Sequence, residues 1–180
     1  MTTSRIRRQL LAAAAMLPLV PAGRAAPCGG VTPAQTEGPF FKSGTPERTS
    51  LVESGANGVR LVVTGRVISA RDCRPVPGAV LEFWHSDERG QYDNRGYRYR
   101  GHQRTDDKGG YRLETIVPAR YTGRTRHIHV KVTAHGAHLL TTQLYFPNEP
   151  ANRQDGLYRP DLELVMAEGN VGRFDFVVTV

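Results

Sequence analysis

Short stretches in which apolar and polar residues alternate follow one another from residue 59 to the end of the chain. Alternation with a period of two is typical of strands that bury one face. Segments rich in Gly, Pro and Asp, which are typical of turns, separate these stretches. The pattern predicts strands at residues 59–68, 79–85, 111–116, 127–133, 139–146 and 172–180. A helical period extends over at most one turn, near residues 161–166.

Many short strands with regular turns are typical of an antiparallel sandwich. We therefore predict an all-β fold, an antiparallel β-sandwich with long loops that carry the active site, over residues 59–180. The longest predicted loops are residues 86–110 and 146–160. Residues 26–58 are rich in Gly, Pro, Ser and Thr and have little periodicity, so we expect an extended N-terminal arm there.

Residues 1–25 resemble an export signal and not a part of the fold. A segment with three arginines precedes an apolar run at residues 10–20, and a region of small residues suggests cleavage after Ala25. The run is too short to span a bilayer, so we expect no stable membrane insertion. The segment also resembles a twin-arginine signal, and both that route and the general secretory route stay open. We expect an exported protein, periplasmic or extracellular.

Removal of this signal changes the charge of the chain. The whole sequence has 24 basic and 17 acidic residues, a net charge of +7. Four arginines and no acid lie in the first 25 residues, so 20 basic and 17 acidic residues remain, or +3. The charge therefore gives little support to a nucleic-acid partner, and we expect none. The remaining length, about 155 residues, is enough for one domain with its own core.

The chain has two cysteines, Cys28 and Cys73. An even number of cysteines in an exported chain favours a disulfide. The bond would join the N-terminal arm to the loop after the first strand. Two free thiols are the alternative.

The strand predicted at residues 127–133 carries His127 and His129. Residues i and i+2 of a strand share a face, so the two imidazoles lie on the same side. Neutral imidazole is the commonest protein metal ligand, and the pair is close enough to bind one ion. Two solvated histidines on the polar face of an edge strand would show the same pattern.

Further polar and aromatic residues lie next to this pair. Tyr121 lies in a turn before the strand, and Tyr92 lies in the loop just beyond another strand. Loops beside strands commonly carry functional side chains. Arg124 and Arg126 stand between Tyr121 and the histidines. Arginine does not ligate metals, but it can hold an anion beside one.

A set of short motifs resembles the intradiol ring-cleavage dioxygenases, the family of protocatechuate 3,4-dioxygenase and catechol 1,2-dioxygenase. No single motif is decisive, but the ordered set is highly specific and extends over about residues 33–147. The motifs are Thr36-Glu37-Gly38-Pro39-Phe40, Trp84 with Gly90-x-Tyr92, Thr105-Asp106-x-x-Gly109-x-Tyr111, Thr115-Ile116-x-Pro118-x-x-Tyr121, His127-Ile128-His129 and Thr142-Gln143-Leu144-Tyr145-Phe146.

The resemblance implies a non-haem iron(III) cofactor held by Tyr92, Tyr121, His127 and His129. Iron(III) is a hard ion that suits anionic oxygen ligands better than thiolates. A free tyrosine has a pKa of about 10, and a trivalent cation beside it lowers that pKa enough to ionise the phenol. Without the motifs, the two tyrosines would be interpreted as amphipathic anchors of their loops.

The resemblance also implies catalytic roles. Arg124 stands three residues before His127, where the family has an arginine that stabilises negative charge on the substrate ring. Arg126 stands where the family has alanine, and either arginine could serve. Gln143 matches an active-site glutamine. Tyr121 matches the tyrosine that leaves when the diol binds and then acts as a base.

The implied reaction is cleavage of a catechol-type ring by O2 between its two hydroxyl-bearing carbons, giving a muconate-type diacid. The partners are therefore a small aromatic diol and O2, and Thr36, Gly38 and Pro39 are expected in the substrate pocket. The segment from Tyr121 to His127 is shorter than in larger members, and a long helical N-terminal region is absent. The site is expected to be more open, the diol is not determined, and homo-oligomerisation stays open.

Two other functions fit parts of the sequence. Residues 65–80 also resemble transthyretin-like binding modules, which would need no metal. A zinc hydrolase could use the two histidines with an acid such as Asp106. His85 is expected to form structural hydrogen bonds, and solvated positions are expected for the remaining histidines, His102, His135 and His138.

Overall fold

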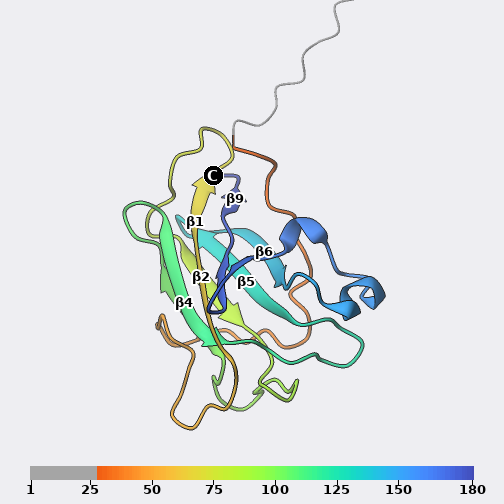
Figure 1. Cartoon of the computed structure of the whole chain (residues 1–180). Helices are drawn as coiled ribbons and strands as arrows, with labels where there is room; N and C mark the ends of the chain where they lie inside the picture. Colours follow the sequence, from red (N-terminus) through yellow and green to blue (C-terminus); the bar gives the residue numbers. More distant parts are fainter. Residues whose placement is uncertain (1–27) are drawn as a thin grey trace, which may run out of the picture.

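Two β-sheets face each other in a computed structural model that describes residues 28–180 (Figure 1). The predicted export signal at residues 1–25 lies outside the described residues. The strands are β1 (Arg60–Ser69), β2 (Val80–Trp84), β3 (Arg100–Arg104), β4 (Gly110–Ile116), β5 (His127–Ala134), β6 (Ala137–Tyr145), β7 (Val165–Ala167), β8 (Val171–Arg173) and β9 (Phe176–Val178). Two short 3-10 helices, η1 (Pro150–Gln154) and η2 (Pro160–Leu162), follow β6.

The two sheets have different strand orders. The first has the order β4-β1-β8-β7, with β9 also paired to β1, and the second has the order β3-β2-β5-β6. All pairs in the second sheet are antiparallel. In the first sheet β1 pairs with β4 antiparallel, but with β8 and β9 in parallel. The predicted all-β sandwich is confirmed, and its C-terminal strands add a parallel pairing to the expected antiparallel one.

The alternating residues that predicted the strands form the core between the sheets. Val63 on β1, Phe83 on β2 and Ile128 on β5 are among the fully or almost fully buried side chains. Each such side chain contributes roughly 1.5–3 kcal/mol by leaving water. Ile128 and Val130 face this core. His127 and His129 alternate with them along the strand and therefore face away from it. The core therefore determines on which side of the second sheet the histidines lie.

Three elements differ from the sequence prediction. Strand β3 lies inside the predicted loop at residues 86–110. The expected helical turn near residues 161–166 is the 3-10 helix η2 followed by β7. The last predicted strand is divided into β8 and β9. Between them the backbone pairing with β1 is interrupted, and Arg66 N of β1 donates to the Asp175 carboxylate instead.

The N-terminal arm is extended, as expected, and it is bonded to both sheets. Its backbone N–H groups at Thr32 and Gln35 donate to Val177 O and Thr141 O, at 2.9 and 2.8 Å. Further along, Leu51 donates to Glu114 O, and its side chain is fully buried in the core. A disulfide joins Cys28 at the start of the described arm to Cys73. The arm thus runs from one end of the sandwich to the other (Figure 1).

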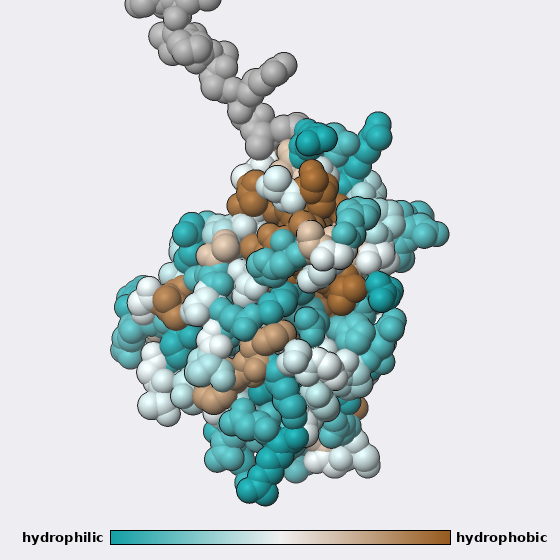
Figure 2. Space-filling model, turned by 180° about the vertical axis from the view of Figure 1, so that it is seen from behind, coloured by the Kyte–Doolittle hydropathy of each residue, from teal (hydrophilic) through white to brown (hydrophobic). Residues whose placement is uncertain are grey.

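Apolar side chains reach the surface at scattered positions. Figure 2 shows brown residues in patches between hydrophilic ones on the face opposite to Figure 1. The most exposed large apolar residue is Val165 on β7, with 73% of its surface exposed. None of the helices in residues 28–180 is long and apolar enough to cross a membrane.

Candidate metal centre and active site

One row of side chains crosses the second sheet on the face turned away from the core. Arg100 on β3 pairs with Trp84 on β2, and Trp84 pairs with His129 on β5. His129 in turn pairs with Gln143 on β6. Residues that pair directly across strands have their side chains on one face. The antiparallel register therefore brings four side chains from distant parts of the sequence into one line.

The two histidines converge at their Nε2 atoms, which are 3.2 Å apart. His127 Nδ1 lies 2.7 Å from Thr125 O. Because a carbonyl oxygen can only accept, Nδ1 carries the proton, and the lone pair of Nε2 faces His129. Burial lowers the pKa of His127 to about 4, and it lowers the pKa of His129 well below its ordinary value. Both rings are therefore neutral at pH 7, the form that binds metals.

Trp84 and the arm enclose His129. The Trp84 ring stacks on the imidazole, with ring centroids 4.8 Å apart. On the arm, Gly38 has a φ of +71°, and a Cβ at this position would lie 3.4 Å from His129 Cε1. The positive φ and the close approach both favour glycine. His129 Nδ1 is buried and has no hydrogen-bond partner among the described residues.

Tyr92 brings an oxygen to the same point. Its hydroxyl group lies 3.2 Å from His127 Nε2. The loop of Tyr92 is packed against the loop of Tyr121, since a Cβ at Gly90 would lie only 2.2 Å from Arg120 O. Burial raises the pKa of the Tyr92 phenol well above its ordinary value, although Arg124 and Arg100 act in the opposite direction. A nearby cation is therefore needed to ionise this phenol at neutral pH.

Tyr121 lies beside Tyr92 through ring contacts. The centroids of the two rings are 5.8 Å apart, at an angle of 80°. Phe40 of the arm packs against both tyrosines, stacked on Tyr92 at 4.3 Å and edge-on to Tyr121 at 5.1 Å. Tyr121 is half-buried. The structure thus groups Tyr92, Tyr121, His127 and His129, the four residues that the resemblance implies as ligands.

This donor set fits iron(III). Donor atoms that share one ion at bond lengths of about 2 Å stand roughly 3 Å apart, as the Nε2 atoms and the Tyr92 oxygen do. His127 also has the Nδ1–H···O=C bond that usually orients a ligating imidazole. Among residues 28–180, no three His, Cys, Asp or Glu side chains form a group that could hold a metal. The donor beside the two imidazoles is the Tyr92 oxygen, and phenol oxygens suit a hard trivalent ion.

Arg124 faces this centre from the next turn. Its Nη2 donates to Gln143 Oε1 at 2.5 Å and to the Tyr145 hydroxyl at 3.3 Å. Its Nε donates to both carboxylate oxygens of Asp155, at 3.0 and 2.8 Å. Its positive charge acts against protonation of His127 and His129. This is the electrostatic influence expected of an arginine beside a metal centre.

Arg126 points to a different partner. Its Nε lies 3.0 Å from Glu149 Oε1. The side chain lines a surface cavity with Val117, Pro118 and other residues. The sequence left open which arginine serves the site. The contacts distinguish them, because Arg124 and not Arg126 is bonded to Gln143.

Gln143 is fully buried on the face of β6 that carries the site. Its Nε2 donates to Thr36 O at 3.0 Å, which ties the arm to the sheet. Of the three residues expected in the pocket, Thr36 and Gly38 thus contact the row of the site. Pro39 lies between Gly38 and Phe40 and is exposed.

Sequence reasoning missed two residues that hold the site together. Arg100 is almost fully buried, and its Nη1 donates to Phe40 O at 2.5 Å while its Nε donates to Asp93 O at 2.9 Å. It thus fixes both the arm and the loop of Tyr92. Phe40 was recognised only as part of a motif. The only sequence signal for Arg100 was its place in an arginine-rich loop, and such loops are also typical of solvated surfaces.

The other histidines have structural or surface positions. His85 is buried and bonded to Ser86 O and Thr115 Oγ1, as predicted. His135 and His138 are exposed, also as predicted. His102 differs, because it lies half-buried on β3 and is bonded to Thr45 Oγ1.

Asp106, the acid of the zinc hydrolase alternative, lies in the turn between β3 and β4. Its Oδ1 accepts hydrogen bonds from the backbone N–H groups of Lys108 and Gly110, at 2.8 and 2.7 Å. It therefore caps a turn, and the three-ligand zinc group is not assembled.

Comparison with known proteins identifies the class. A family model described as dioxygenase matches residues 36–172. The catechol 1,2-dioxygenase of Acinetobacter baylyi is 31% identical over 156 residues, 71% of this chain and 50% of that protein. The hydroxyquinol 1,2-dioxygenase of Nocardioides simplex is 31% identical over 154 residues, 72% of this chain and 52% of that protein. This chain therefore belongs to the intradiol ring-cleavage dioxygenase family.

Solved structures show the same fold. The dioxygenase domain of a dioxygenase and carbohydrate-binding protein fusion from Streptomyces sp. SirexAA-E is 51% identical, with a TM-score of 0.79, covering 84% of this chain and 99% of that domain. The 3-chlorocatechol 1,2-dioxygenase of Rhodococcus opacus 1CP is 25% identical, with a TM-score of 0.74, covering 82% of this chain and 72% of that one. The chain spans about half the length of the two relatives from Acinetobacter and Nocardioides.

Proposed function

We propose that this protein is an exported iron(III) dioxygenase that cleaves a catechol-type ring between its two hydroxyl-bearing carbons. The observation that carries the proposal is the convergence of Tyr92, His127 and His129 beside Arg124, in a member of this family. The relatives act on catechol, chlorocatechol and hydroxyquinol, as their names state. The substrates proposed here are therefore a small aromatic diol and O2, and the product is a muconate-type diacid.

Tyr92, Tyr121, His127 and His129 would hold the iron. When bound, the ion supplies a Lewis acid that lowers the pKa of the diol hydroxyl groups and makes the ring reactive towards O2. The His127 Nδ1–H bond to Thr125 O would orient this imidazole towards the ion. The arm excludes water from the His129 side, where Gly38 approaches the ring.

Tyr121 is proposed as the base. Its phenolate oxygen would accept a proton from one substrate hydroxyl group, in the manner of general base catalysis. The Tyr121 side chain is held by ring contacts with Tyr92 and Phe40. Gly123, with a φ of +75°, lies in the turn that follows. The glycine turn supports a tyrosine whose loop can change position when the diol binds, and the ring contacts define where it starts.

Arg124 is proposed to stabilise negative charge that develops on the substrate. Gln143 and Tyr145 hold its Nη2, so the guanidinium group is oriented before the substrate arrives. A donor fixed in this way costs no reorganisation during the reaction. Arg124 acts here on the substrate, and Gln143 acts by positioning Arg124 and the arm.

The test combines colour with turnover. The protein, expressed with its export signal and purified with iron, should absorb visible light through phenolate-to-iron charge transfer. Catechol, protocatechuate and hydroxyquinol are then screened for O2 uptake. We expect a coloured protein with at least one active diol. A coloured protein without O2 uptake on any of them, or a colourless one that retains zinc, would refute the proposal.

A further inference from the structure

Asp155 is a buried acid whose position is defined entirely by the residues next to the site. Only 2% of its side-chain surface is exposed. Oδ2 accepts a hydrogen bond from Thr125 N at 2.9 Å, and Oδ1 accepts one from Leu157 N at 2.9 Å. Both oxygens accept from Arg124 Nε. The carboxylate therefore binds two adjacent residues, Arg124 and Thr125, at the start of the segment that leads into β5.

Hydrogen bonds occupy the edge of the Arg124 guanidinium group that carries Nε and Nη2. Nε is bound to Asp155, and Nη2 is bound to Gln143 and Tyr145. No hydrogen bond to Nη1 is found within residues 28–180. Because the guanidinium group is planar and rigid, fixing Nε and Nη2 also fixes Nη1. The pair of N–H groups on Nη1 is thus left free in a defined orientation.

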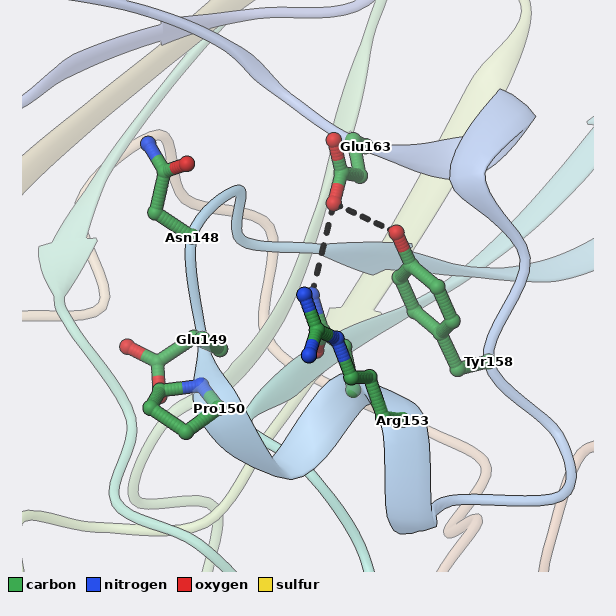
Figure 3. A pocket seen from close by; sticks show the side chains of 7 residues that line it. Asn148, Glu149, Pro150, Arg153, Tyr158 and Glu163 are labelled. Atoms are coloured by element: carbon green, nitrogen blue, oxygen red, sulfur yellow. Dashed lines mark hydrogen bonds between the residues drawn. The ribbon is translucent and has the colours of Figure 1, made fainter.

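The loop that carries Asp155 is itself firmly held. Asn152 in η1 accepts a hydrogen bond from Thr125 Oγ1 at 2.7 Å and donates to Phe146 O at 2.9 Å. Figure 3 shows Glu163 beside η1, where its Oε1 accepts a hydrogen bond from the Tyr158 hydroxyl group at 2.6 Å. The same oxygen accepts one from Asn152 Nδ2 at 3.3 Å. These bonds fix η1 between β6 and the segment before β5. Asp155 is therefore held in place by its own loop, and its position does not depend on Arg124.

The charge of Asp155 also matters to the centre. An unpaired arginine beside three positive charges on iron would weaken metal binding, because like charges repel. Asp155 carries one negative charge against Arg124 at 2.8 Å. The pair therefore presents a directed donor with little net charge.

We propose that Asp155 is a positioning residue that holds Arg124 in its working orientation through Nε. This inference rests on the proposed function, because it assigns Asp155 to the arginine of that reaction. Asp155 itself touches neither the proposed ligands nor the substrate in this scheme. Asp155 also binds Thr125, whose carbonyl oxygen orients His127. An effect through His127 would lower bound iron, whereas an effect through Arg124 lowers turnover alone.

The experiment compares four iron-loaded full-chain variants with the wild type. They are Asp155→Asn, Arg124→Ala, the double variant, and the matched control Glu149→Gln, which breaks the neighbouring ion pair to Arg126. We expect Asp155→Asn to lower kcat about 10- to 100-fold, because misplacing a catalytic group by about 1 Å can cost roughly 100-fold. KM should change less than about 3-fold, and iron content and the visible band should be retained. Glu149→Gln should keep wild-type values.

Dependence on Arg124 distinguishes positioning from a general structural effect. In the Arg124→Ala background, Asp155→Asn should change kcat by less than about 2-fold, because coupled residues are not additive. An equal loss in both backgrounds, or a wild-type kcat for Asp155→Asn, would overturn the proposal. Asp155→Glu keeps the buried charge, and it replaces Asp155→Asn in the experiment if that variant does not fold. Its loss of kcat must likewise disappear in the Arg124→Ala background.

A second readout does not depend on turnover. In full-chain protein loaded with gallium(III), a diamagnetic trivalent ion, the Arg124 Nε–H resonance should be protected from solvent exchange. It should stay protected in Glu149→Gln and lose protection in Asp155→Asn. A protected resonance in Asp155→Asn would overturn the proposal. If the wild type turns over no diol, the proposed function fails, while this readout still decides whether Asp155 holds Arg124.

Discussion

The Nε2 atoms of His127 and His129 lie 3.2 Å apart on the face of the second sheet that the arm covers. His127 uses its Nδ1 proton on Thr125 O, so one lone pair faces both His129 and the Tyr92 hydroxyl group. His129 Nε2 and the Tyr92 oxygen thus stand at one lone pair. A metal ion in the proposed centre would be bound by the lone pairs of both imidazoles and by the Tyr92 oxygen, and only the phenol would lose its proton.

The first prediction concerns the ligands. His127→Ala, His129→Ala and Tyr92→Phe should each reduce bound iron and abolish the visible band, because each removes one donor atom. Iron per chain and the absorption spectrum are the measurements. His138→Ala is the control, since His138 is exposed and its ring contacts Thr141 Oγ1 and none of the proposed ligands. A ligand variant that keeps full iron and colour removes that residue from the centre.

The second prediction separates the two tyrosines. Tyr121→Phe should keep iron on Tyr92, His127 and His129 but slow the binding of the diol, because the proposed base is lost. Rapid mixing with catechol, followed at visible wavelengths, measures this step. If Tyr121→Phe binds the diol as fast as the wild type does, Tyr121 is not the base.

The third prediction concerns the two arginines. Arg124→Ala should keep the colour and the spectral change on diol binding, yet lower kcat about 100- to 1000-fold, as loss of a preorganised donor does. Arg126→Ala is the matched control, and we expect kcat to fall less than about 3-fold, because Arg126 forms a half-buried ion pair with Glu149 and is not bonded to Gln143. The reverse ranking of the two variants would show that the wrong arginine has been assigned.

Most of the fold could be predicted from the alternating residues, because burial of one face determines the side of each residue in a strand. Strand β3 could not, since it reads Arg-Gly-His-Gln-Arg and has no apolar alternation. Its Arg100 and Gln103 are buried through pairing and through cover by other segments. The two short strands β8 and β9 were merged, because apolar residues continue across Phe174 between them.

The candidate site was only partly visible in the sequence. Two histidines and two tyrosines in ordered motifs indicated the ligands, and local spacing was enough for the His-x-His pair. Asp155 and Arg100 reach their partners over 31 and 60 residues. Such contacts depend on strand register and loop path, which single-sequence patterns do not contain. The sequence could not decide between Arg124 and Arg126 for the same reason.

The fourth prediction concerns the disulfide. Cys28 and Cys73 close a loop over 45 residues and tie the start of the arm that covers the site. The double variant Cys28→Ser/Cys73→Ser should lose about 2–4 kcal/mol of unfolding free energy, a fall in Tm of roughly 5–15 °C. Thermal unfolding measures this loss. Mass spectrometry that finds two free thiols in protein from an oxidising compartment would contradict the prediction.

The fifth prediction concerns pH. Burial lowers the pKa of His85 from 6.5 to about 4. Below pH 6.5 the unfolded chain binds a proton that the folded chain rejects, so this contribution to stability is complete above pH 6.5 and is lost as the pH falls towards 4. The loss is at most about 3 kcal/mol. Urea unfolding of the metal-free protein across this range should show one proton fewer taken up by His85→Gln than by the wild type. His135→Gln, at an exposed position, should leave the slope of unfolding free energy against pH unchanged. If His85→Gln also leaves this slope unchanged, the pH dependence does not come from His85.

The most direct test of the proposed reaction is the product formed from the active diol under 18O2. The account predicts a ring-opened diacid that carries two 18O atoms, one in each new carboxyl group, with one O2 consumed per diol. A product opened beside the diol and not between its hydroxyl-bearing carbons would contradict the account, and so would a quinone without incorporated oxygen.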